Sequence, residues 1–126
     1  MKISVSSYSF QQYITAGKMT QLDCVSKAKE LGFDAIEFID LDAPDFQSKQ
    51  ELAIQLKAEA ERVGIEINAY TVWANLFWDN SEDSEREVER IKKQLQIAKL
   101  LGVEVMRHDV CGALGKTGNS RSFDLR

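Results

Sequence analysis

The stretch that decides the fold is "AKELGFDAIEF", Ala28 to Phe38, because its pattern occurs three times in the chain. "AERVGIEINAY" spans residues 60–70, and "AKLLGVEVMRH" spans residues 98–108. In each copy an alanine stands four residues before a glycine, and an apolar residue stands on each side of that glycine. The glycines recur at spacings of 32 and 38 residues, which suits one helix plus one strand. The pattern therefore predicts a repeated helix–strand unit.

Each of the three glycines follows a segment with helical periodicity, because apolar residues recur three or four positions apart before it. A glycine at this point supplies the left-handed backbone that commonly ends a helix. The apolar positions of the three segments are Leu22, Val25, Ala28 and Leu31; Leu52, Leu56, Ala60 and Val63; and Val88, Ile91, Leu95 and Ala98. We therefore expect three helices that end at Gly32, Gly64 and Gly102.

The starts of these helices are indicated by capping boxes, in which a hydroxyl residue precedes an acidic residue by three positions. Such pairs are Ser48 with Glu51 and Ser84 with Glu87, and Thr20 with Asp23 is a weaker relative. They predict the starts of the second, third and first helix, respectively.

A strand-like run follows each glycine, and a fourth run, "KISVSSYSF", lies at residues 2–10. One helix between successive strands favours a parallel α/β sheet with right-handed crossovers. A doubly wound sheet usually carries a glycine-rich phosphate loop after its first strand, and no GxGxxG follows this one. The sequence therefore favours a (β/α) TIM-barrel-type repeat.

The length limits how much of a barrel this sequence contains. A complete eight-unit barrel needs about 250 residues, and this chain has 126 residues. We expect a single domain, residues 1–126, that forms about half a barrel with four parallel strands and three to four helices. Its two outer strands would then be exposed edges, and we expect a homo-oligomer formed through them.

Composition excludes several classes of protein. The chain has 16 basic and 20 acidic residues and a net charge of -4, which disfavours a nucleic-acid partner. Its two cysteines are too few for a disulfide scaffold. No signal-peptide layout and no apolar run of about 20 residues is found, so we expect no membrane contact and a cytoplasmic location.

The motifs "LGFDAIEF" and "LGVEVMRHDV" resemble those of the sugar phosphate isomerase/epimerase family, the xylose isomerase-like TIM barrels. The resemblance implies metal-assisted isomerisation or epimerisation of a small sugar or sugar phosphate. It also implies a divalent metal cation held by two glutamates, an aspartate and a histidine in the second half of the barrel. None of those four positions falls within this sequence, so we expect no metal site in this chain and incomplete catalysis.

Two other functions remain open. One is a non-catalytic half-barrel that self-associates or binds a ligand without turnover. The lesser alternative is a relative of the abasic-site endonucleases in the same superfamily. That activity needs several histidines and a basic face, and a single histidine with a net charge of -4 disfavours it.

Glu37 and His108 are the candidate catalytic residues. Glu37 lies at the end of the second strand, where a barrel directs side chains to its active face. The structural alternative is a buried ion pair between Glu37 and Arg107. His108 is a candidate because a histidine side chain suits acid–base chemistry or contact with a substrate hydroxyl. Its structural alternative is a strand-end histidine bonded to a backbone carbonyl.

The candidate substrate-binding residues are Trp73, Arg107, Asp109 and Tyr8. Strand alternation predicts Arg107 and Asp109 on one side of the fourth strand and His108 on the other. Trp73 begins an aromatic loop that suits the wall of a sugar site, although such rings also cover a barrel end or fill a subunit contact.

The segment "CGALGKTGNS", residues 111–120, contains the letters GKT but lacks the first glycine of a phosphate loop. It is expected to be the loop after the fourth strand, with Cys111 as an ordinary thiol.

Overall fold

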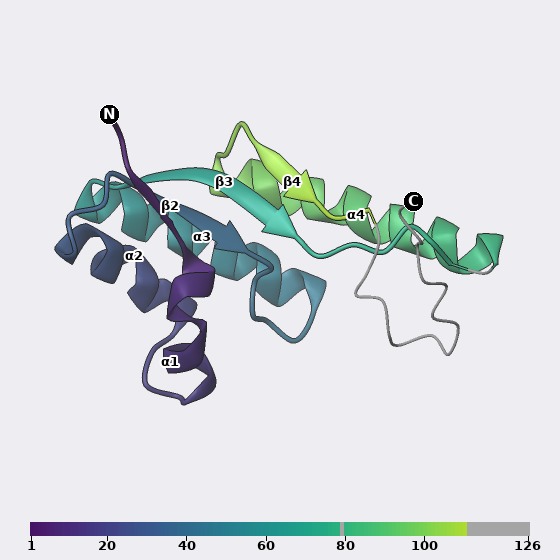
Figure 1. Cartoon of the computed structure of the whole chain (residues 1–126), viewed down its shortest axis with the longest axis horizontal. Coiled ribbons are helices and arrows are strands. Elements are labelled where there is room, and N and C mark those ends of the chain that lie inside the picture. Colours follow the sequence, from purple (N-terminus) through teal and green to yellow (C-terminus); the bar gives the residue numbers. More distant parts are fainter. Residues whose placement is uncertain (79, 111–126) are drawn as a thin grey trace, which may run out of the picture.

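A computed structural model of the chain describes residues 1–78 and 80–110. The helices and strands alternate along the chain as the sequence predicts (Figure 1). The strands are β1 (Ser4–Ser6), β2 (Ala35–Ile39), β3 (Glu66–Val72) and β4 (Met106–His108). The helices are the 3-10 turn η1 (Ser7–Phe10), α1 (Gln11–Thr15), α2 (Gln21–Glu30), α3 (Phe46–Val63) and α4 (Ser81–Leu101).

The four strands form one parallel sheet in the order β1-β2-β3-β4. The helices α2, α3 and α4 each connect one strand to the next, and Figure 1 shows them gathered along one side of the sheet. A sequential parallel order of this kind is that of a TIM barrel, whereas a doubly wound sheet changes direction at a switch point. The predicted fold class, an α/β sheet of four parallel strands within part of a TIM barrel, is confirmed.

The hydrophobic core lies between the sheet and the helices. Its strand residues include Ile36, Phe38 and Tyr70, all fully buried. They pack in one cluster with helix residues such as Val25 of α2 and Leu56 of α3. Burial of this apolar surface is the main term that holds the sheet and helices together.

The predicted helix ends are confirmed at the glycines. Gly64 ends α3 with φ of 72°, and Gly102 ends α4 with φ of 76°. Both lie in the left-handed region, which a residue with a side chain rarely adopts. At Gly64 the amide donates back to the carbonyl of Ala60 at 3.0 Å, which closes the last turn.

Two of the three predicted helix starts are wrong. The α3 helix begins before Ser48, because Asp45 is its N-cap and accepts a hydrogen bond from the Ser48 amide at 2.8 Å. Similarly, Asn80 caps α4 through the Asp83 amide at 2.8 Å. Aspartate and asparagine compete with serine for this position, and here they stand one turn earlier. The third prediction is confirmed, since Thr20 and its partner form a complete capping box.

The first strand is shorter than the predicted run at residues 2–10. The chain leaves β1 after Ser6, whose hydroxyl accepts a hydrogen bond from the Tyr8 amide at 3.4 Å and begins η1. The predicted loop at residues 111–120, with Cys111, lies outside the described residues. Among the helices of the part that is described, none combines the length and the apolar character needed to cross a bilayer.

Candidate binding site on the open face of the sheet

The two faces of the sheet carry different side chains. In β2, Ile36 and Phe38 point into the core beneath the helices, and Glu37 between them is only half-buried. Successive strand residues alternate between faces, so Glu37 points away from the helices. We call the face opposite α2, α3 and α4 the open face.

The Glu37 carboxylate is held by a neighbouring strand. The Thr71 hydroxyl of β3 donates to Glu37 Oε1 at 2.5 Å, and Thr71 is 6% exposed. A register irregularity at Ile36/Glu37 places Glu37 opposite Ala69. Such bulges are common beside active sites because they redirect side chains. The hydrogen bond fixes the carboxylate on the open face near the carboxyl end of the sheet.

The predicted ion pair between Glu37 and Arg107 is wrong. No ion pair joins them among the residues 1–78 and 80–110. Arg107 lies on β4, two strands from β2, which corresponds to roughly 10 Å between backbones. Thr71 lies on β3, the strand between them, and its hydroxyl is the hydrogen-bond partner of the Glu37 carboxylate.

Arg107, Asp109 and Trp73 are on the same face as Glu37. Arg107 is the register partner of Thr71 and is exposed. Asp109 continues the pairing beyond β4, because its amide donates to the Val72 carbonyl at 3.4 Å. Trp73 follows Thr71 by two positions, so alternation directs it to this face, and it is 51% exposed.

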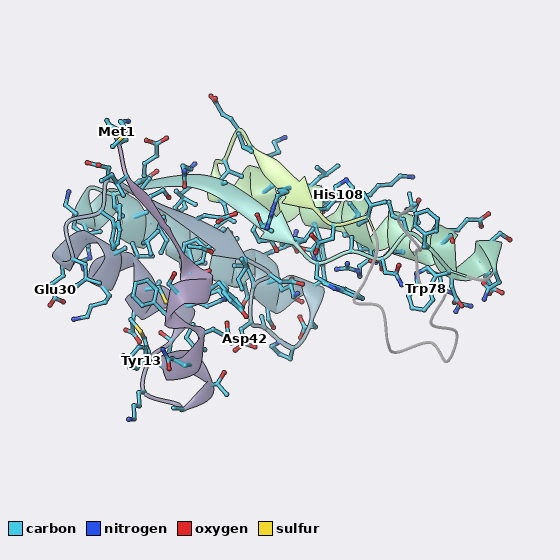
Figure 2. The ribbon with its side chains drawn as sticks, in the orientation of Figure 1. Met1, Tyr13, Glu30, Asp42, Trp78 and His108 are labelled. Atoms are coloured by element: carbon cyan, nitrogen blue, oxygen red, sulfur yellow. The ribbon has the colours of Figure 1, made fainter. Side chains whose placement is uncertain are left out.

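His108 is on the other side of β4. Its register partner is Val72, which is fully buried on the helix side. The predicted alternation of Arg107 and Asp109 against His108 therefore agrees with the register. The His108 Nδ1 lies 2.8 Å from the Asp109 carbonyl oxygen, so the tautomer protonated at Nδ1 donates this bond and leaves Nε2 with its lone pair. Figure 2 shows His108 on β4.

The remaining predicted residue, Tyr8, lies in η1 just beyond β1 and is 67% exposed. The structure thus brings Glu37, Arg107, Asp109 and Trp73 to one face, with Tyr8 beyond the end of the first strand. It separates His108 from that group. Figure 2 shows Trp78 far from His108, toward the amino end of α4.

Two loops at the carboxyl end of the sheet are held by side chains that the sequence did not indicate. After β2, Gln21 donates to the Asp40 carbonyl at 3.1 Å and accepts from the Asp42 amide at 2.8 Å. After β3, Glu87 accepts from the Asn75 amide at 3.0 Å. Both clamping side chains are buried.

A second side chain of α4 completes the clamp after β3. Arg90 donates to the Trp73 carbonyl and forms an ion pair with Glu87 at 2.8 Å. The hydrogen bonds from Arg90 hold the pKa of the Glu87 carboxyl below its ordinary value. The sequence offers one signal for this clamp. Glu87 and Gln94 are seven residues apart, which places both on the same side of α4, and both are buried there.

The described residues do not fit a complete site for the divalent cation that the resemblance implies. No group of three or more His, Cys, Asp or Glu side chains comes together among them in a way that would hold a metal ion. A catalytic metal site needs about three protein ligands. The candidate site on the open face consists of the Glu37 carboxylate, the Arg107 guanidinium and the Trp73 indole.

Two other features lie away from this face. Cys24 is fully buried in α2, and burial raises the pKa of its thiol to about 11, which disfavours the reactive thiolate. A hollow of about 600 Å³ lies beside α1 and α2, with Phe10, Tyr13 and Leu31 among its walls. Neither feature contributes a side chain to the open face.

A comparison with known protein families agrees with the fold seen in the structure. A family model described as xylose isomerase-like TIM barrel matches residues 25–122. No curated protein matches the chain. The matched segment covers most of the chain and includes β2, β3 and β4 with their helices. The chain belongs to the xylose isomerase-like TIM barrel family.

Proposed function

We propose that the chain binds a small sugar or sugar phosphate on the open face and belongs to an isomerase or epimerase. The observation that carries this proposal is the Glu37 carboxylate, which Thr71 orients on the face that also carries Arg107. Ligands of TIM barrels bind at the carboxyl ends of the strands. The Glu37 carboxylate reaches toward that end from the middle of β2, because its partner Thr71 is the penultimate residue of β3. The family match supports the fold on which this proposal rests.

Each side chain has a distinct part in this proposal. Arg107 is exposed and always charged, and its planar donors suit a phosphate group. The Glu37 carboxylate accepts hydrogen bonds from sugar hydroxyls. Trp73 provides an apolar surface for one face of the sugar ring. Asp109 and Tyr8 lie at the edge of this group and supply further polar contacts.

The chemistry that fits is movement of a proton on a carbon beside a carbonyl. Glu37 is the proton acceptor, because it is the oriented carboxylate on the substrate side of the sheet. His108 lies on the opposite side of β4, with its Nδ1 2.8 Å from the Asp109 carbonyl oxygen, and takes no part in this transfer, so the Glu37 carboxyl that takes the proton also returns it. The described residues offer no group of three or more metal-ligating side chains, so the proton transfer rests on Glu37 itself.

Binding is tested by titrating the chain with ketopentose and ketohexose phosphates and with the matching free sugars. Arg107→Gln is expected to weaken binding of the phosphates about tenfold or more and to leave the free sugars nearly unchanged. Arg86→Gln is the matched control, since Arg86 pairs only with Glu82 and Asp83 on the outer surface of α4 within the described residues. Equal losses in the two variants would contradict the role of Arg107.

Glu37→Gln is expected to weaken phosphates and free sugars alike, with Glu104→Gln, on an exposed turn before β4, as control. Proton transfer is read from deuterium incorporation beside the sugar carbonyl in heavy water. Wild-type incorporation that disappears in Glu37→Gln supports the isomerase assignment. Binding without incorporation would favour a ligand-binding protein without turnover.

The exposed sheet edges favour a second candidate function, self-association. In the described part of the chain, β1 and β4 each pair with a strand on one side only. A free parallel edge is a site for another strand, and we propose that β4 of one copy pairs with β1 of another. Light scattering over a concentration series is expected to show a dimer. A monomer at every concentration would contradict it.

A further inference from the structure

The loop after β3 is fixed at three consecutive residues. Arg90 donates to the carbonyl of Trp73, and Glu87 accepts from the amide of Asn75 at 3.0 Å. Ala74 between them is fully buried. The two side chains that hold the loop are themselves paired at 2.8 Å. The backbone of this segment is thus bound by one donor and one acceptor from the same helix.

The Glu87–Arg90 clamp and the Trp73 ring beside it differ in solvent exposure. Glu87 is 8% exposed, whereas Trp73 is 51% exposed and contributes little to the core. Arg90 is half-buried, and an ion pair partly removed from water often contributes little to stability, because the loss of hydration offsets the attraction of the charges. A better-attested use of such supporting groups is to hold a binding side chain in one geometry.

We propose that the Glu87–Arg90 pair is a positioning device for Trp73: it fixes the backbone on both sides of Ala74, and with it the direction in which the indole ring leaves the chain to serve on the open face as a platform for the apolar face of a sugar ring. The role of Trp73 as a sugar platform rests on the proposed function. The role of Glu87 and Arg90 as a clamp rests on their contacts alone. Ordering the ring before the ligand arrives removes an entropy cost that binding would otherwise bear. Glu87 and Arg90 act through Trp73 and are positioning residues.

The chain offers a direct readout, because it has only two tryptophans. With ¹⁵N-labelled tryptophan the indole N–H groups give two resonances, and Trp73→Phe assigns them. The order parameter of the Trp73 indole is expected to be that of a rigid group, about 0.85, in the wild type. In Arg90→Lys it is expected to fall below about 0.6, because lysine lacks the fork that reaches both Trp73 and Glu87.

Two controls separate positioning from a general loss of structure. Arg86→Lys, on the same helix but paired with Glu82 and Asp83, is expected to leave Trp73 rigid. Glu87→Gln keeps an oxygen for the Asn75 amide and loses the ion pair, so a smaller loss of order is expected. If Arg90→Lys loses its cooperative thermal transition, Glu87→Gln decides the question.

The same variants are titrated with the ketopentose and ketohexose phosphates. Arg90→Lys is expected to raise Kd about two- to tenfold, the cost of ordering one side chain, with little change in Tm relative to Arg86→Lys. A Trp73 indole that is equally rigid in Arg90→Lys, or already mobile in the wild type, would overturn the clamp. A third outcome is that the Trp73 indole loses order in Arg90→Lys but the wild type binds no sugar phosphate. The clamp would then stand, and both the sugar platform and the proposed function would be overturned.

Discussion

The helix-covered face and the open face of the sheet are built from alternate residues of the same strands, yet their chemistry is opposite. On the covered face, Phe38 and Val72 are fully buried among apolar side chains. On the open face, Glu37 bonds Thr71, and Arg107 stands exposed beside them. A parallel sheet is usually apolar on both faces because both are normally covered. The difference teaches that one face holds the fold together and the other is available for a polar ligand.

The largest effect is expected from breaking the covered face. Phe38→Ala removes a fully buried ring and is expected to lower the free energy of unfolding by about 3–5 kcal/mol. Ile39→Ala changes the next residue, which is half-buried on the open face, and a smaller loss is expected. Urea unfolding of both variants measures the contrast. Equal losses would mean that the two faces are equally important for stability.

A buried hydrogen bond on the covered face gives the next largest effect. The Tyr70 hydroxyl donates to Gln94 Oε1 at 2.8 Å, and both side chains are buried. Tyr70→Phe leaves that oxygen without this donor and is expected to cost about 1–3 kcal/mol in chemical denaturation. Tyr13→Phe, on an exposed part of α1, is the control and is expected to change stability by less than about 0.5 kcal/mol. A similar value for the two variants would rule out a stabilising role for the Tyr70–Gln94 bond.

The sequence predicted the architecture of this sheet better than its polar details. The glycine repeat was sufficient for four parallel strands and for the helix ends, because a left-handed turn leaves few choices of residue. The same repeat placed Glu37 and Arg107 on the correct strands, but Glu37 is the middle residue of β2 and not its last, as was predicted. The pairing of Glu37 with Thr71 was missed, because it depends on the register between β2 and β3 and its irregularity at Glu37.

The inner side of α4 was also misjudged. The apolar spacing included Val88 and Leu95, but these are 41% and 54% exposed, and Glu87 and Gln94 are buried in their place. Buried polar residues of this kind have partners in other elements, the Asn75 amide and the Tyr70 hydroxyl. A hydrophobic pattern carries no information on such partners. The loop clamps were missed for the same reason.

A substitution at the end of α3, just before β3, is expected to lower the free energy of unfolding by a smaller amount. Gly64 has φ of 72°, and a Cβ there would meet no atom within 4 Å. Gly64→Ala therefore costs only the backbone strain of the left-handed conformation, about 1 kcal/mol. The shift in the urea midpoint measures it. No change would indicate that the end of α3 rearranges to avoid the strain.

The smallest effect is expected on the outer surface of the helices and appears only in acid. Hydrogen bonds from Arg62, and then from Ser26, lower the pKa of the Glu59 carboxyl to about 2 from an ordinary value of 4.5. A lowered folded-state pKa contributes stability above pH 4.5, which is lost as the pH falls toward 2. Denaturation midpoints across this window are expected to fall less steeply in Glu59→Gln. Parallel curves for the variant and the wild type would refute this contribution.

The most direct test of the division between the two faces is Glu37→Leu, measured for stability and for binding in the same preparation. The variant is expected to lose less free energy of unfolding than Phe38→Ala, about 1–3 kcal/mol, because the hydrogen bond that it removes within the described residues is the one from the buried Thr71 hydroxyl. Its affinity for sugar phosphates is expected to fall about tenfold or more. A loss of several kcal/mol in stability, or an unchanged affinity, would contradict the assignment of the open face to ligand binding.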